Sequence, residues 1–259
     1  MTQRGAEGAR TAGARPTPTA PFFFLSGVLP SKQMYVYMAD GRGGFGERSG
    51  AYRWPHLKYG VSIDPDLTGW QDGAYHVMDN GVLNLWRGGK LKRISSGWTK
   101  YDRVFSPGTL TRAKHPDVLA RDKQGVLWRH QMKADGTMAP RVRIGAGWGQ
   151  FTQIAGLGDL NGDSVPDLVA RDKQGVLWMY RGTGKADAPF AKRVRIGSGW
   201  NRFNKLVATG DVDGDRRSDL LARDAKGGLW LYKGTGKLSG PLKAAGRVGT
   251  GFNQYTELF

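Results

Sequence analysis

The chain has no cysteine, which excludes disulfide bonds and thiolate metal sites and leaves the redox compartment open. No stretch approaches the roughly 20 apolar residues that a membrane-spanning helix requires, so we expect no membrane span. Histidine is scarce, with four in 259 residues, and none lies at a spacing typical of a metal site or a catalytic triad. We interpret all four as ordinary surface or loop residues.

Catalytic signatures are missing as well. The sequence contains neither a nucleophile-elbow motif nor a zinc-protease motif. It therefore predicts a protein that is not an enzyme. A polysaccharide lyase or hydrolase is the weaker alternative, for which no residues stand out.

Basic residues are abundant but not clustered. The formal net charge is +17, yet no run of five or more Lys or Arg occurs. A positive surface favours acidic partners such as teichoic acids, sulfated or uronic glycans, or nucleic acid, although an Arg-rich composition alone also explains the charge. Because the basic residues are spread along the chain, we expect no specific nucleic-acid site.

The N-terminal segment differs from the rest of the chain. Residues 1–20 are polar, rich in Gly, Ala, Thr and Pro, and lack hydrophobic periodicity, so we expect disorder there. Residues 22–25 are apolar and faintly resemble a secretory signal, but no small-residue cleavage site follows. We interpret them as a strand and assign residues 21–259 to the folded domain.

A nearly verbatim repeat of about fifty residues organises this domain. One phrase occupies residues 119–128, 169–178 and 221–230, with a looser copy at 79–86 and a hidden one at 25–37. A second phrase occupies residues 93–98, 143–148, 195–200 and 248–252. The two phrases give two series of aromatic positions, namely Tyr35, Trp86, Trp128, Trp178 and Trp230, and Trp54, Trp98, Trp148, Trp200 and Phe252.

Each repeat is typical of a propeller blade. Apolar residues alternate at period two in residues 176–180 and 193–196, and Gly-Thr-Gly-Lys sequences mark hairpin turns. Four short strands per repeat predict an all-β fold, a β-propeller of five blades. Residues 252–259 match 200–207, so the last strand is expected to complete the first blade and close the ring. A fragment of a larger ring is the alternative.

Two nine-residue loops carry the clearest chemistry. Oxygen-bearing side chains fall at positions 1, 3, 5 and 9, with a main-chain carbonyl expected at position 7 and Gly at position 4, a pattern suited to Ca²⁺. An EF-hand is excluded because position 12 is Ala170 or Ala222 and the flanks are strands. The predicted ligands are Asp159, Asn161, Asp163, Val165 and Asp167 in one loop, and Asp211, Asp213, Asp215, Arg217 and Asp219 in the other.

The loop pattern and its fifty-residue spacing resemble the FG-GAP/VCBS repeat, and the surrounding phrases resemble secreted repeat proteins of actinobacteria. The resemblance covers roughly residues 22–259. It implies an extracellular β-propeller whose loop aspartates bind calcium structurally at the positions just named. Two calcium sites are expected rather than five, because the other repeats have lost ligands.

The degenerate loops supply the candidate ligand-binding residues. The loop at 109–117 keeps only Asp117, and we expect Arg112 or Lys114 to replace the charge of the ion. The loop that begins at Asp66 places Trp70 at position 5. Eight of the nine tryptophans fall in the two aromatic series and are interpreted as core between blades, which leaves Trp70 as the candidate for an exposed binding aromatic. Trp70 and Arg112 are therefore the predicted ligand-binding residues.

Two functions remain open. The first is a secreted, monomeric, calcium-binding module that binds carbohydrate in the manner of a lectin, with a glycan or acidic cell-surface polymer as partner. The second is a scaffold for protein–protein interaction or adhesion of the integrin type. Both hypotheses rest on the fold, and the loops that diverge from the repeat are where they predict the ligand.

Overall fold

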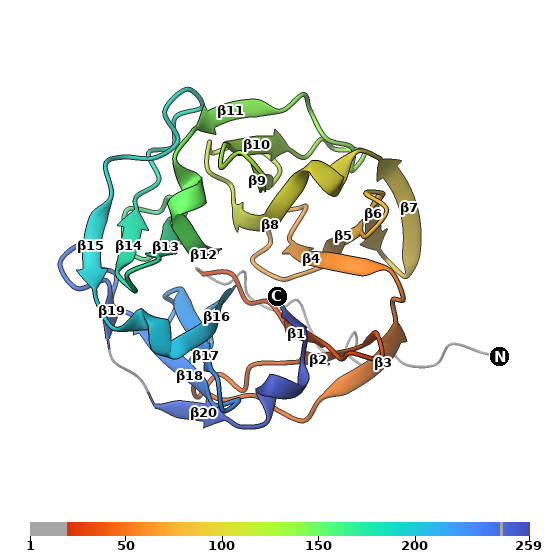
Figure 1. The fold of residues 1–259 in the computed structure, drawn as a ribbon. Helices are drawn as coiled ribbons and strands as arrows, with labels where there is room; N and C mark the ends of the chain where they lie inside the picture. Colours follow the sequence, from red (N-terminus) through yellow and green to blue (C-terminus); the bar gives the residue numbers. More distant parts are fainter. Residues whose placement is uncertain (1–19, 244–245) are drawn as a thin grey trace.

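The computed structural model describes residues 20–243 and 246–259. Five antiparallel sheets stand around a central axis, and the chain passes through them in order (Figure 1). The predicted five-bladed β-propeller is therefore confirmed. Within the described residues there is no α-helix, and no helix has the length and hydrophobicity to cross a membrane.

The strands of each blade are given from the axis outward. Blade 1 contains β21 (Glu257–Leu258), β1 (Leu25–Val28), β2 (Gln33–Tyr37) and β3 (Ser49–Arg53). Blade 2 contains β4 (Leu57–Ile63), β5 (Gly73–Met78), β6 (Leu83–Arg87) and β7 (Lys90–Ser95). Blade 3 contains β8 (Tyr101–Gly108), β9 (Asp117–Asp122), β10 (Leu127–Gln131) and β11 (Val142–Gly145).

Blade 4 contains β12 (Phe151–Ala155), β13 (Leu168–Asp172), β14 (Leu177–Tyr180) and β15 (Val194–Gly197). Blade 5 contains β16 (Phe203–Gly210), β17 (Asp219–Asp224), β18 (Leu229–Gly234) and an outer edge in two pieces, β19 (Leu242–Lys243) and β20 (Arg247–Gly249), which both pair with β18. Short 3₁₀ helices lead out of blades 2 to 5, namely η1 (Trp98–Lys100), η2 (Trp148–Gln150), η3 (Trp200–Arg202) and η4 (Phe252–Gln254).

The ring closes through the first blade, as expected from the terminal repeat. Strand β21 pairs antiparallel with β1, Gly27 opposite Leu258 and Val28 opposite Glu257. Ser26 and Phe259 exchange main-chain hydrogen bonds of 2.7 and 3.0 Å. Blade 1 is thus built from both ends of the described chain.

The second aromatic series packs between blades. Trp148 follows blade 3, and its ring lies 4.6 Å from that of Tyr180 in blade 4. The same contact recurs one blade further on, where Trp200 lies 4.5 Å from Tyr232. Aromatic pairs of this kind contribute about 0.5–1.5 kcal/mol beyond the area they bury. The repeated tryptophans of this series are core residues, as the sequence predicted.

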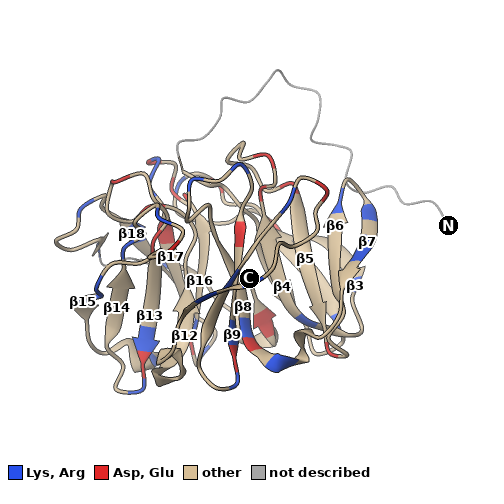
Figure 2. Ribbon diagram, turned by 90° about the horizontal axis from the view of Figure 1, so that it is seen from above, with Lys and Arg blue, Asp and Glu red and all other residues tan. Residues whose placement is uncertain are grey.

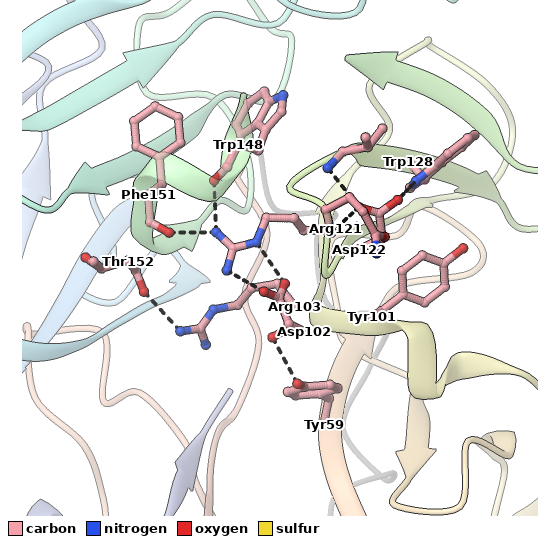
Figure 3. A network of polar contacts seen from close by, with 12 residues as sticks. Tyr59, Tyr101, Asp102, Arg103, Arg121, Asp122, Trp128, Trp148, Phe151 and Thr152 are labelled. Carbon is pink, nitrogen blue, oxygen red and sulfur yellow. Dashed lines mark hydrogen bonds and ion pairs between the residues drawn. The ribbon is translucent and has the colours of Figure 1, made fainter. Parts of the chain in front are cut away.

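An arginine from the second strand of a blade also links it to the next one. The guanidinium of Arg121 in β9 donates to the carbonyl oxygens of Trp148 and Phe151 at 2.9 and 2.6 Å and to the carboxylate of Asp102 (Figure 3). Arg171 and Arg223 make the equivalent main-chain contacts in blades 4 and 5. The repeated Ala-Arg-Asp sequence therefore joins neighbouring blades.

The predictions that Trp86 belongs to the first aromatic series and that residues 22–25 form a strand are corrected by the structure. In blade 3, Trp128 pairs with Arg143 of the outer strand. In blade 2 the corresponding residue is Asn84, which pairs with Arg93, and Trp86 lies two residues later. Strand β1 begins at Leu25, and Phe22 only forms isolated bridges before it. The predicted disorder of residues 1–20 falls outside the described residues, except for Ala20, which is buried.

Candidate metal loops and an adjacent pocket

The candidate loops lie together on one face of the ring. They connect the innermost strand of a blade to the second strand, and in Figure 2 they form part of the upper edge of the propeller. We call this face the Asp-loop face, defined by residues 64–72, 109–117, 159–167 and 211–219. The Gly-Thr-Gly-Lys turns lie on the same face, because each follows the third strand of its blade.

In blade 5 three predicted ligands converge. Carboxylate oxygens of Asp211, Asp213 and Asp215 lie within 4.8 Å of one another. Asp211 holds the loop in place by accepting hydrogen bonds from the amides of Gly214 and Arg216 at 2.7 and 2.8 Å. Burial raises the pKa of Asp211, and the charges of Asp213 and Asp215 raise it further. Such a cluster is suited to a hard divalent cation.

Asp219, the last predicted ligand of this loop, is almost fully buried. Its two oxygens accept hydrogen bonds from the amides of Val212 and Gly234. Burial raises the pKa of Asp219 to about 7. Arg217 at position 7 turns its side chain back to Asp215 at 3.2 Å, so only its carbonyl remains as the predicted ligand.

The blade 4 loop repeats this arrangement. Asp159 accepts hydrogen bonds from the amides of Asn161, Gly162 and Ser164. The side chain of Asn161 donates to the buried carboxylate of Asp167, whose pKa burial raises to about 6.

The two remaining predicted positions of this loop lie next to each other. Asp163 accepts from the amide of Val165 at 3.0 Å. The side chain of Val165 is buried, which fits a residue that offers only its carbonyl.

In blade 3 an arginine takes over the charge of the missing ion, but it is neither Arg112 nor Lys114. Arg129 of β10 donates to Asp117 at 3.0 Å, and both side chains are buried. The prediction for Arg112 and Lys114 was wrong because Arg129 reaches Asp117 from the neighbouring strand. Arg112 instead lies over the blade 4 turn, where a Cβ on Gly184 would come within 3.1 Å of its Nε atom.

In blade 2 the loop starts two residues earlier than predicted. Asp64, not Asp66, holds it by accepting hydrogen bonds from the amides of Thr68 and Gly69. Arg87 donates to Asp66 and also to Asp72 at 2.5 and 3.1 Å, so a guanidinium lies among these carboxylates.

Trp70 is not an exposed binding aromatic in this loop. It is half-buried, and its ring packs 5.1 Å from that of Phe22. Trp70 therefore anchors the segment that leads into β1.

Each loop also touches the turn of the next blade. A Cβ on Gly162 would lie 2.6 Å from the carbonyl oxygen of Gly236, and one on Gly214 would lie 2.8 Å from that of Gly41. Both loop glycines have positive φ, at 89° and 80°. Glycine is therefore required at position 4 for two reasons, its left-handed backbone and its contact with the neighbouring blade.

A cavity of about 290 Å³ lies where the loops of blades 4 and 5 meet. We call it the blade 4–5 pocket. Its walls are Asp159 and Gly162 of the first loop, Arg216, Arg217 and Ser218 of the second, Thr235, Gly236 and Lys237 of the blade 5 turn, and Ala20. Asp159 and Arg217 were predicted as calcium ligands, whereas the other polar residues of the pocket were not predicted. A signal was present in the sequence, since Arg216-Arg217 differs from Ser164-Val165 at the same loop positions.

Comparison with known families bears on the two intact loops. The FG-GAP-like repeat family model matches residues 159–222. This FG-GAP-like segment spans both loops with four predicted oxygen side chains, so the resemblance is confirmed where its motif is complete. A search of curated proteins finds no sequence that matches the chain.

Solved structures resemble the propeller as a whole. AofleA from Arthrobotrys oligospora is 11% identical with a TM-score of 0.52, over 92% of this chain and 75% of that one. BP39L lectin from Burkholderia pseudomallei is 14% identical with a TM-score of 0.48, over 85% and 67%. Hsv2 from Kluyveromyces lactis is 13% identical with a TM-score of 0.45, over 88% and 62%. The first likeness shows the propeller fold, and none assigns an activity to this chain.

The histidines lie away from the FG-GAP-like loops, but two are not surface residues as predicted. His76 in β5 and His130 in β10 are buried, and burial lowers the pKa of each to about 4. His76 packs 4.1 Å from the ring of Trp54, and His130 shares a 3.0 Å hydrogen bond with the hydroxyl of Tyr101. They are therefore parts of the core.

A second polar group surrounds the propeller axis. The innermost strands place one polar residue each at the same position of the repeat. Lys205 and Glu257 form an ion pair at 2.6 Å, and Arg103 donates to the carbonyl of Thr152. Arg103, Lys205 and Glu257 line an axial cavity of about 90 Å³. The five residues of this ring are Tyr59, Arg103, Gln153, Lys205 and Glu257.

Proposed function

We propose that this chain is a non-catalytic β-propeller, stabilised by calcium in the loops of blades 4 and 5, that binds glycans on its Asp-loop face. The FG-GAP-like segment at residues 159–222 supports the calcium part of the proposal. The pocket beside these loops supports the glycan part. Secretion belongs to the same proposal, since extracellular calcium modules work at calcium concentrations of about 10⁻⁴–10⁻³ M.

The observation that carries the proposal is a contrast between blades. The buried carboxylate of Asp117 in blade 3 is balanced by Arg129. The residues that occupy the place of Arg129 in blades 4 and 5 are apolar, Met179 and Leu231. A buried carboxylate without a cation is costly, and a bound cation removes that cost. Among blades 3, 4 and 5, the two that lack the arginine are those that keep the full set of ligands.

Calcium fits the donor sets that are present. Ca²⁺ takes six to eight oxygen ligands, and each loop offers four oxygen-bearing side chains and a carbonyl, with water completing the set. Asp213 and Asp215 would turn toward the ion together with Asp211, and Asn161 would contribute its amide oxygen in blade 4. The ion would supply charge compensation and fix the loop, with no step of chemistry assigned to it.

Binding rather than catalysis suits the polar groups of this face. The loop carboxylates are engaged by main-chain amides, and two histidines lie in the core. The blade 4–5 pocket offers hydroxyl, ammonium and guanidinium groups in a small volume. Ligands rich in hydroxyl or acidic groups match such walls better than a flat protein surface does.

Two experiments test the proposal. Calorimetry should show two calcium sites, D211N/D215N should remove one, and calcium should raise the melting temperature because it binds the folded state only. An unchanged melting temperature on adding EDTA would reject the calcium part.

A glycan array in the presence of calcium tests the second part. Binding to neutral or acidic glycans is expected. No glycan binding together with a specific protein partner would replace the lectin proposal by the interaction scaffold.

A further inference from the structure

The blade 4–5 pocket has a marked charge asymmetry. Among the described residues, Arg216, Arg217 and Lys237 line it, and Asp159 contributes the only carboxylate. Arg217 pairs with Asp215, whereas Arg216 and Lys237 are exposed and have no ion pair within the described residues. Two cationic groups are thus available to a ligand in this pocket.

Arg216 and Arg217 do not belong to the repeated framework, whereas Lys237 ends a Gly-Thr-Gly-Lys turn that also occurs at residues 182–185. The basic pair of the blade 5 loop stands where the blade 4 loop has Ser164 and Val165. The calcium pattern places no requirement on the side chains at these two positions. Position 7 contributes only its main-chain carbonyl, and position 6 contributes no ligand. The arginine pair is therefore a local property of one junction between blades, where it adds its charge to the lysine of the repeated turn.

The remaining walls indicate polar contacts. The Oγ atom of Ser218 is buried beside Gly158 and has no hydrogen-bond partner among the residues that the structure describes, so it is not presented to a ligand. Thr235 contributes a hydroxyl, which donates to the carbonyl of Gly240 and retains acceptor capacity. None of the described residues that line the pocket is aromatic, so they do not provide the stacking that often holds neutral sugars.

The size of the pocket limits the ligand. Its volume of about 290 Å³ is just below the roughly 300–1,000 Å³ that is typical of small-molecule sites. One sugar ring or its charged substituent fits such a space, whereas a polymer would have to continue across the open face.

We propose that the blade 4–5 pocket binds the anionic group of an acidic sugar, a carboxylate or a sulfate, through Arg216 and Lys237. This inference rests on the proposed glycan-binding function and names its ligand class. Guanidinium and ammonium groups form charge-assisted hydrogen bonds with such anions, which are stronger than those between neutral groups.

The test is an NMR titration of the full chain, with calcium present, using methyl glucuronide, methyl glucoside 6-sulfate and methyl glucoside. We expect both charged sugars to bind at least tenfold more tightly than the neutral one. The variant R216Q/K237Q should weaken their binding at least tenfold. The matched control K185Q/R195Q removes the same charge from the blade 4 turn and an outer strand and should leave binding unchanged.

Each outcome of the titration either supports or overturns the binding of an acidic sugar at this pocket. Tighter binding of the glucuronide or of the sulfated sugar supports the proposal and shows whether the pocket prefers a carboxylate or a sulfate. Equal loss of affinity in the control would show diffuse charge attraction and overturn the pocket. Tight binding of the neutral sugar, or equal binding of single-stranded DNA at this pocket, would overturn the ligand class. A positive glycan array without binding of the charged sugars overturns this inference alone, whereas a negative array overturns the proposed function.

Discussion

The Nζ atom of Lys233 lies 2.7 Å from Oδ2 of Asp213, within the carboxylate cluster of blade 5. Lys233 is the penultimate residue of β18, the third strand of the blade, and reaches the loop from the side. Its ammonium offsets part of the repulsion among Asp211, Asp213 and Asp215. Arg87 occupies the corresponding place in blade 2 and contacts Asp66 in the same way.

Replacing Lys233 with Met should strengthen calcium binding. The ammonium competes with the ion for the charge of Asp213, and half-exposed pairs of this kind contribute up to about 1 kcal/mol, so we expect a roughly threefold gain in affinity at one of two sites. Calorimetry measures the change, with K185M as the control for removing a turn lysine. Weaker binding in K233M would show that Lys233 positions Asp213 for the ion.

Replacing Arg129 with Met should destabilise the propeller. Asp117 is fully buried, and without the guanidinium its charge has no counterion, which costs about 3–5 kcal/mol. Urea unfolding measures the loss. The double variant D117N/R129M should recover most of it, because a neutral amide needs no counterion. A single variant as stable as the parent would argue that the pair contributes nothing to folding.

Replacing Gly60 with Ala should loosen ring closure. A Cβ at this position would lie 1.9 Å from Cζ of Phe259, whose ring covers Gly60 from the closing strand. Overpacking of this kind costs about 1–3 kcal/mol in thermal or urea unfolding.

The control for this change is G145A, since nothing lies within 4 Å of a Cβ there. In the background of F259A, which removes the ring, G60A should cost little. If the losses of unfolding free energy in G60A and F259A added fully in the double variant, the contact between Gly60 and Phe259 would be contradicted.

Acid should destabilise the protein through His76 and His130. The pKa of each is lowered to about 4 in the folded state, against about 6.5 when unfolded, so the unfolded state binds protons first as the pH falls. The stability that the neutral rings contribute is complete above pH 6.5 and is lost as the pH falls through 4. Each histidine contributes up to about 3 kcal/mol to the pH-dependent part of the free energy of unfolding.

The measurement for the histidines is urea unfolding between pH 7 and 4. H76F and H130F should each flatten the pH dependence relative to the parent, and the exposed residue His56 supplies the control H56A. An unchanged slope in both core variants would mean that other groups dominate the acid response.

The repeat made most of the fold predictable. Identical phrases at a fixed spacing reveal the blade, and the match between residues 252–259 and 200–207 reveals closure without any contact being known. The two intact loops were equally accessible, because their ligands are local in sequence. The aromatic core between blades followed from the recurrence of residues such as Trp148 and Trp200.

In blade 2 the wrong residue was assigned to the aromatic series because side chains along a strand alternate between its two faces with a period of two residues. Trp86 and Asn84 differ by two residues and point to the same face of the strand, so the hydrophobic pattern cannot tell them apart. The pairing of Arg129 with Asp117 depends on the register between β9 and β10 and leaves no local signal. His76 was assigned to the surface or a loop because it lies outside the repeated framework, although the ring of Trp54 packs against it.

Closure by so short a strand also determines how the ring responds to force. Strand β21 contributes two residue pairs to β1, and the neighbouring bonds of Ser26 with Phe259 stand at the end where both segments leave the sheet. Tension applied at Leu25 and Phe259 would load these bonds one after another, as in peeling, and not all at once, as in shearing. Blade 1 should therefore open first and at low force, while the covalently continuous blades 2 to 5 remain folded.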